Sequence, residues 1–182
     1  MMKSCLISIL VSLVSFTAAW GQASGTQVTE TDSTLTLRNS KVRVEFPKGE
    51  AFDISKLTLN GKELVLSKGY NTVPWTLTYK GPQGENPVLF PSHGEYAGWA
   101  KTTKDGHVAI AFKWNMRLTY QDLVPVVMTV SLPGDSELAY WDIQAGTPDG
   151  WLVSNTQFPR ITVTRPDKAK LITSAGWGAE YN

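Results

Sequence analysis

A strict alternation of apolar residues between positions 108 and 120 constrains the fold of this chain more than any other feature. In "VAIAFKWNMRLTY" every second residue is apolar: Val108, Ile110, Phe112, Trp114, Met116, Leu118 and Tyr120. A period of two places successive side chains on opposite faces of a β-strand, whereas a helix needs a period of 3.6. The segment therefore predicts one long strand with a buried face, or two strands in register across a kink near Asn115.

The same period of two recurs in two further segments. In "VPVVMTVSL" and "LRNSKVRVEF" the aligned apolar residues are Val124, Val126, Met128, Val130 and Leu132, and then Val42, Val44 and Phe46. Pro125 has no N–H for a β-ladder and is expected near a strand start or at a sheet edge. No window of helical length shows an apolar stripe, so the pattern predicts an all-β protein.

Turn-forming residues separate the expected strands. Asn60-Gly61 in "LTLNGKELVL" and Asp105-Gly106 in "KDGH" suit hairpin turns, whose central residues need positive φ. Pro133-Gly134 suits a type II turn, and Pro148-Asp149-Gly150 supplies another turn. Short strands with frequent turns predict an antiparallel β-sandwich.

The first 21 residues have the pattern of a secretory signal peptide. Lys3 precedes an apolar run from about Leu6 to Phe16, and Ala19-Trp20-Gly21 fits a small-x-small cleavage site before Gln22. The run is too short for a spanning helix, although an uncleaved membrane anchor is the alternative. Cys5 lies before the apolar run rather than after it, which argues against a lipid anchor. We therefore expect an exported protein, periplasmic or extracellular.

Cleavage would leave 161 residues (182 − 21), with residues 22–27 as a tail and residues 28–182 as one β-sandwich domain. Cys5 is the only cysteine, so the mature domain must rely on a hydrophobic core rather than on disulfides. Lys+Arg falls from 17 to 16 when Lys3 is removed, against 16 Asp+Glu, which gives a net charge of zero. Nucleic acids and anionic membranes are therefore not expected as partners.

The mature chain is rich in tryptophan, with Trp75, Trp99, Trp114, Trp141, Trp151 and Trp177. Such residues either fill the space between two packed sheets or stack against sugar rings. Burial of aromatic area dominates core energetics, so packing is the first expectation for each of them.

The segment "FPSHGEYAGWAK" is the first candidate site and is expected to be a loop between two strands. It collects His93, Glu95, Tyr96, Trp99 and Lys101 among glycines that let a ligand approach the backbone. Aromatic rings can stack on sugars, and Glu and Lys can bond hydroxyls. The alternative is a loop held against the sandwich by its aromatic residues.

A second candidate lies in "LAYWDIQAG", an expected strand in which Tyr140, Asp142 and Gln144 share one face. That face either lines a cleft or is an ordinary solvated surface. His93 and His107 are the only histidines, too few for a zinc site without cysteine, so no metal or cofactor is expected. No pair of carboxylates stands out as catalytic, and no phosphate-binding glycine motif is present.

Two stretches carry a family resemblance. "STLTLRNSKVRVEFPKGEAFDISKLTLNGKELVL" and "FPRITVTRPDKAKLITSAGWG" resemble parts of the galactose-mutarotase-like supersandwich domains that precede the catalytic barrels of secreted bacterial glycoside hydrolases. The resemblance covers about residues 28–181. It implies a supersandwich fold, and it implies that the catalytic carboxylates lie on a downstream barrel, so no catalytic residue is carried over to this chain.

The function expected on these grounds is that of a non-catalytic N-terminal accessory domain, with a glycan and a downstream catalytic domain as partners. A free-standing glycan-binding module, favoured by exposed coplanar aromatic rings, and a structural or adhesive sandwich are the alternatives. Trp177 and Tyr181 follow the last expected strand, with nothing after them to cover their rings. We expect the chain after Ser174 to be poorly packed until a following domain covers it.

Overall fold

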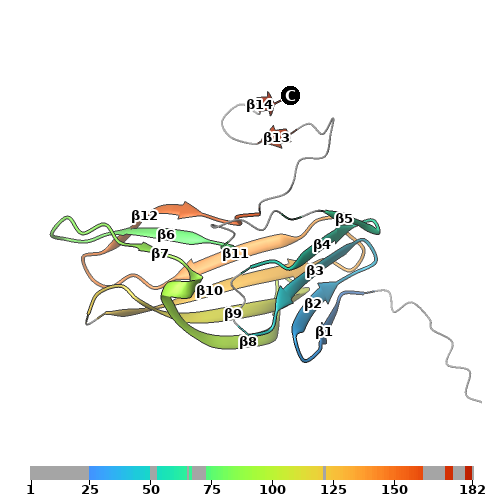
Figure 1. Cartoon of the computed structure of the whole chain (residues 1–182), viewed down its shortest axis with the longest axis horizontal. Helices are drawn as coiled ribbons and strands as arrows, with labels where there is room; N and C mark the ends of the chain where they lie inside the picture. Colours follow the sequence, from blue (N-terminus) through green and yellow to red (C-terminus); the bar gives the residue numbers. More distant parts are fainter. Residues whose placement is uncertain are drawn as a thin grey trace, which may run out of the picture.

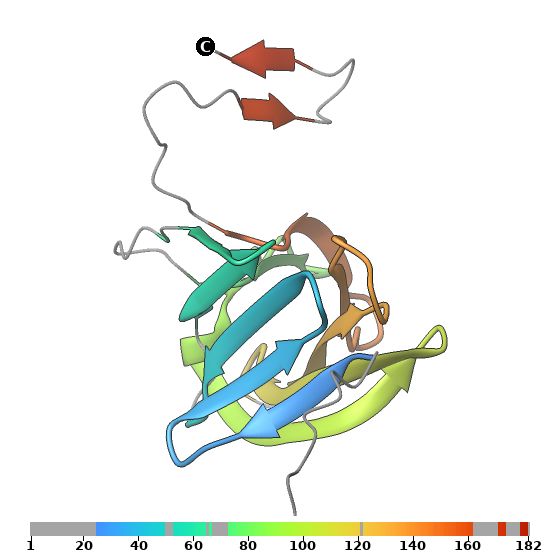
Figure 2. The ribbon, with the colours of Figure 1, turned by 90° about the vertical axis from the view of Figure 1, so that its right-hand side faces the viewer.

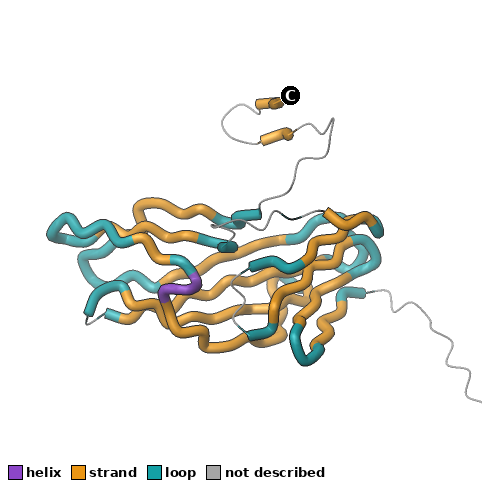
Figure 3. Tube along the Cα trace, in the orientation of Figure 1, coloured by secondary structure: helices purple, strands orange, loops and turns teal. Residues whose placement is uncertain are grey.

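The computed structural model describes residues 25–49, 53–64, 66, 73–120 and 122–161, and the backbone of residues 171–173 and 179–181. Within these ranges strands joined by loops make up the chain, and the one helical segment is a short 3-10 helix, as Figure 3 shows. No helix in the described part is long and apolar enough to cross a membrane.

The first sheet has five antiparallel strands in sequence order (Figure 1). They are β1 (Gln27–Glu30), β2 (Thr34–Arg38), β3 (Val42–Pro47), β4 (Lys56–Leu59) and β5 (Lys62–Leu64). The alternation predicted for β3 is confirmed, since Val42, Val44 and Phe46 are at most 4% exposed. Asn60 and Gly61 both have positive φ between β4 and β5, as the hairpin requires.

The second sheet has four antiparallel strands in the order β11-β10-β9-β8. They are β8 (Gly94–Lys104), β9 (His107–Arg117), β10 (Leu123–Leu132) and β11 (Tyr140–Ala145). β9 is a single strand, which confirms the first of the two predicted forms. Tyr120 lies beyond its end and is 92% exposed, so its expected place on the buried face is wrong. Pro125 lies near the start of β10, before the ladder with β11 begins at Val126.

The third sheet has three strands, and several loops complete the fold. Its strands are β6 (Thr76–Lys80), β7 (Val88–Leu89) and β12 (Leu152–Gln157), and the 3-10 helix η1 spans Pro91–His93. β13 (Leu171–Thr173) pairs with β14 (Ala179–Tyr181).

The predicted turn before β12 is confirmed by a hydrogen bond from Trp151 N to Pro148 O (3.0 Å) and by the positive φ of Gly150. Gly134 does not have a positive φ, so the predicted type II turn at Pro133-Gly134 is wrong.

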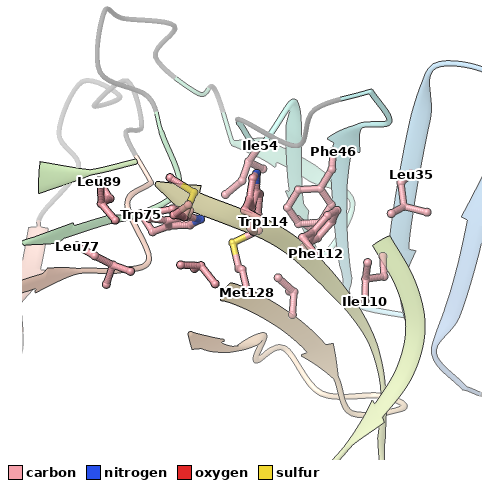
Figure 4. Close-up of a cluster of buried hydrophobic side chains, with 14 of the residues drawn as sticks. Leu35, Phe46, Ile54, Trp75, Leu77, Leu89, Ile110, Phe112, Trp114 and Met128 are labelled. Atoms are coloured by element: carbon pink, nitrogen blue, oxygen red, sulfur yellow. The ribbon is translucent and has the colours of Figure 1, made fainter. Parts of the chain in front are cut away.

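The core lies on the inner face of the four-stranded sheet, which the other two sheets cover together (Figure 2). Phe46 of the first sheet packs on Phe112 of β9, with ring centroids 4.7 Å apart. Trp75, just before β6, packs edge-on against Trp114 of β9 at 5.5 Å. Figure 4 shows both groups of side chains in the same cluster. The predicted antiparallel β-sandwich is thereby confirmed.

The tryptophans of the described part serve packing. Trp75 and Trp114 are at most 1% exposed, and Trp99, Trp141 and Trp151 pack against the same core while partly exposed. Packing is therefore confirmed for these five. Trp177 and the expected leader of residues 1–21 lie outside the described residues.

Β1 begins at Gln27, one residue before the expected start of the domain, and the residue before it is already anchored. Thr26 Oγ1 donates a hydrogen bond to Leu132 O (2.7 Å), which links the residue before β1 to the end of β10. Asn39, in the β2–β3 turn, also links the first sheet to the second. Its Nδ2 donates to Pro133 O (2.6 Å) and Ser136 O (2.8 Å) in the connection that leads into β11.

Candidate functional site

The segment expected to be a loop around His93 is instead η1 followed by the long strand β8. β8 pairs with β9 from Gly94↔Met116 to Lys104↔His107. A Cβ at Gly94 would collide with the sulfur of Met116. Gly98 has a φ of 102° and lies just after a shift in the pairing register of β8 and β9. The glycines that suggested a loop therefore serve close strand packing and a β-bulge.

The five candidates in this segment do not converge on one site. Tyr96 and Trp99 pair with Trp114 and Phe112 and face the core. Lys101 pairs with Ile110 on the same face of β8 but remains exposed. Glu95 pairs with Asn115 on the opposite face and is exposed. His93 ends η1, where its ring lies against Phe90.

Tyr96 belongs to the core rather than to a polar site. Its ring centroid is 5.7 Å from that of Trp114. Its hydroxyl is buried and has no hydrogen-bond partner in the described chain, and burial raises the pKa of Tyr96 to about 12. Leaving a buried polar group unpaired costs about 1–3 kcal/mol. Tyr96 is therefore a neutral phenol whose hydroxyl does not stabilise the fold.

The second candidate strand, β11, places Tyr140 and Asp142 together on the face of the four-stranded sheet turned away from the core. Trp141 and Ile143, between and after them, pack against the core. We call this surface the outer face, and the part of it considered below comprises Lys104, His107, Ala109, Ala111, Thr129, Ser131, Tyr140 and Asp142.

An ion pair crosses the outer face from one edge of the sheet to the other. Lys104 Nζ of β8 lies 3.7 Å from Asp142 Oδ2 of β11, and each side chain is little more than one third exposed. In a flat sheet three strand spacings and an offset of four residues would separate the two backbones by about 20 Å. The right-handed twist accumulated over four strands must therefore raise the end of β8 toward Asp142. Figure 2 shows the strong curvature of β8.

Two aromatic rings lie beside the ion pair. The rings of Tyr140 and His107 are parallel to within 7°, with centroids 6.1 Å apart. Tyr140 is 50% exposed. The Tyr140 ring is thus accessible to a ligand and lies next to a charged pair, whereas the buried tryptophans are not accessible.

Small residues occupy the two central strands between these side chains. Ala109 and Ala111 of β9 pair with Ser131 and Thr129 of β10, and all four are buried although they face away from the core. They form a low floor beneath the Lys104–Asp142 pair. Asp142 Oδ1 is also buried here, and it has no hydrogen-bond partner in the described part of the chain.

The two acidic candidates are not placed for joint catalysis. Glycosidase carboxylates act across one bond, at about 5–9.5 Å. Glu95 lies four residues from Asp142 along the sheet, in the direction opposite to Lys104, and three strands away, which is about 20 Å. The twist that raises Lys104 toward Asp142 carries the other end of β8 away from it. Within the described ranges no group of three or more His, Cys, Asp or Glu could hold a metal ion.

Sequence reasoning missed Lys104 and His107 as members of this surface. A signal for them was present, because the two-residue turn Asp105-Gly106 forces Lys104 and His107 to pair. His107 is also in phase with Ala109 on the side of β9 opposite to the apolar stripe. Their approach to Tyr140 and Asp142 depends on the twist of the whole sheet, which the pattern does not give.

Comparison with known proteins gives one curated relative. A protein of Bacteroides thetaiotaomicron named "Putative glycoside hydrolase" is 35% identical over 178 residues, which cover 97% of this chain and 26% of the relative. This chain therefore spans about a quarter of the length of that protein. No protein-family model and no solved structure matches the chain.

Proposed function

We propose that this chain is a non-catalytic accessory domain of an exported carbohydrate-active enzyme, where it packs on a catalytic barrel and helps to shape the glycan site. The observation that carries the proposal is the coverage in the comparison: nearly all of this chain aligns with only 26% of a protein named as a glycoside hydrolase. A segment of that share is the size of one domain. The finer resemblance to galactose-mutarotase-like supersandwiches is part of the same proposal.

The geometry of the sandwich supports a non-catalytic role. The residues of its inner faces are committed to the core, and Glu95 and Asp142 lie three strands and four residues apart in the register of the sheet. The remaining chemistry of a hydrolase would then be supplied by another part of the enzyme. Export is included in the proposal because of Lys3, the short apolar run and the Ala19-x-Gly21 pattern.

The accessory role is tested by activity and by the gene. The chain on its own, offered aryl glycosides and oligosaccharides, is expected to show no turnover above background. Extension of the reading frame past the codon for Asn182 is expected to reveal a catalytic domain, and the joined protein is expected to be active. Turnover that copurifies with the isolated chain and disappears in Asp142→Ala or Glu95→Ala would contradict the proposal.

One observation favours a second candidate, the free-standing glycan-binding module. The parallel rings of Tyr140 and His107 offer an accessible aromatic surface. The module and the accessory domain differ in the reading frame past Asn182, since the module needs no catalytic domain beside it. A structural or adhesive sandwich, the third alternative, would bind no glycan.

A further inference from the structure

We propose that the outer face carries a saccharide site in which Tyr140 and His107 receive a sugar ring and Asp142 and Lys104 bond its hydroxyls. The inference deepens the proposed function and rests on it for the class of ligand. It places the contact on the outer face near the end of β8, away from the segment around His93 that the sequence favoured.

The aromatic part of the site comes from two strands that are not neighbours. Tyr140 lies on β11 and His107 on β9, and their rings are parallel to within 7°. Tyr140 is half exposed, whereas Trp75 and Trp114 are fully buried. A sugar ring presents an apolar C–H face that suits such a ring, with its hydroxyls directed to the sides.

The polar part of the site has unused hydrogen-bonding capacity. Asp142 Oδ1 is buried without a donor, and the 3.7 Å between Lys104 Nζ and Asp142 Oδ2 is longer than a charge-assisted hydrogen bond. Asp142 Oδ2, the oxygen on the side of Lys104, can therefore still accept from a hydroxyl. Lys104 has three donors for a neighbouring hydroxyl oxygen.

The floor and the charge define the ligand further. Ala109, Ala111 and Ser131 are at most 7% exposed, so a sugar ring would lie above this floor, on the taller side chains that surround it. The two charges of the Lys104–Asp142 pair compensate each other, and the outer face offers no excess of positive charge there. The site therefore suits a neutral sugar rather than a uronic acid or a sulfated sugar.

The test uses the full chain in affinity electrophoresis through gels that contain xyloglucan, galactomannan, arabinoxylan, mixed-linkage β-glucan or amylopectin, with polygalacturonate as the anionic probe. We expect at least one neutral polysaccharide to retard the chain. Tyr140→Ala should weaken that binding by about tenfold and Asp142→Asn by about fivefold, because stacking and a charge-assisted bond are lost. Tyr120→Ala removes a tyrosine outside the site that is even more exposed than Tyr140, and it should leave binding unchanged.

A second readout locates the ligand. The methyl NMR signals of Ala109 and Ala111 should shift when the retarding polysaccharide is supplied as a short oligosaccharide. Retardation by none of the five neutral probes, retardation by polygalacturonate alone, or binding that survives Tyr140→Ala would overturn the site. None of these outcomes bears on the accessory role, which the reading frame past Asn182 tests separately.

Discussion

Replacement of Asn39 by alanine is expected to destabilise the sandwich by about 2–4 kcal/mol. The Asn39 amide makes four hydrogen bonds. Its Nδ2 donates to Pro133 O and Ser136 O, and its Oδ1 accepts from Lys41 N (2.8 Å) and Val42 N (2.6 Å). At about 0.5–1.5 kcal/mol net for each bond, and with water replacing part of them, the sum reaches this range.

The position of Asn39 explains why the loss should extend beyond one turn. The two donated bonds join the β2–β3 turn of the first sheet to the connection between β10 and β11 of the second sheet. Asn39→Asp keeps the two accepted bonds but loses both donations and sets a charge against two carbonyl oxygens. We expect Asn39→Asp to lower the free energy of unfolding by about 2 kcal/mol. Comparison with Asn39→Ala would then distinguish the contribution of the two bonds between the sheets from that of the two bonds within the turn.

The assay is urea unfolding of the full chain followed by tryptophan fluorescence. Asn115→Ala is the matched control, because Asn115 is exposed on β9 and its side chain makes no hydrogen bond to the described residues. The control should change the free energy of unfolding by less than about 0.5 kcal/mol. If Asn39→Ala were equally mild, the two bonds to the β10–β11 connection would not form in solution, and the reasoning would be refuted.

Three further expectations follow from particular residues. Tyr96→Phe should be neutral or stabilising at pH 7, because the buried hydroxyl has no partner. Since burial raises the pKa of Tyr96 to about 12, the unfolded chain loses this proton from about pH 10 while the folded chain keeps it. The wild type should therefore lose stability between pH 10 and 12 to a greater extent than Tyr96→Phe does, and parallel urea midpoints over this range would contradict the assignment. Gly106→Ala should cost about 1 kcal/mol in thermal or urea unfolding, because Gly106 has a φ of 79° beside the positive φ of Asp105; no loss would mean that the turn differs in solution. N-terminal sequencing of the exported protein should begin near Gln22, and an intact Met1 in the cytoplasm would exclude the cleaved leader.

Local features of the sequence were sufficient for the class of fold. The period of two from Val108 to Leu118 predicted β9 and its buried face, and Asn60-Gly61 predicted the β4–β5 hairpin. These features are readable because strand alternation and turn conformation depend on residues that are close in the chain. The alternation continues past Arg117, where the strand itself ends, and it therefore wrongly predicts that Tyr120 lies on the buried face.

The candidate loop around His93 failed as a prediction because its local composition conflicts with its tertiary surroundings. Gly94 and Gly98 suggest a loop, yet pairing with the strongly apolar β9 draws Gly94–Lys104 into the sheet. Strand pairing with a partner of high apolar content outweighs weak local propensity. Four of the five residues singled out there are consequently divided between the two faces of β8, and His93 lies in η1 before it.

The sequence by itself determined that this chain forms antiparallel strands with a large aromatic core, and that Tyr140 and Asp142 share a face. Only the tertiary structure decided what lies opposite them. Lys104 meets Asp142 across four strands because small twists add from strand to strand, and no local pattern records their sum. The same accumulation carries Glu95 away from Asp142, so one physical cause sets both the charged pair of the outer face and the separation of its two acidic candidates.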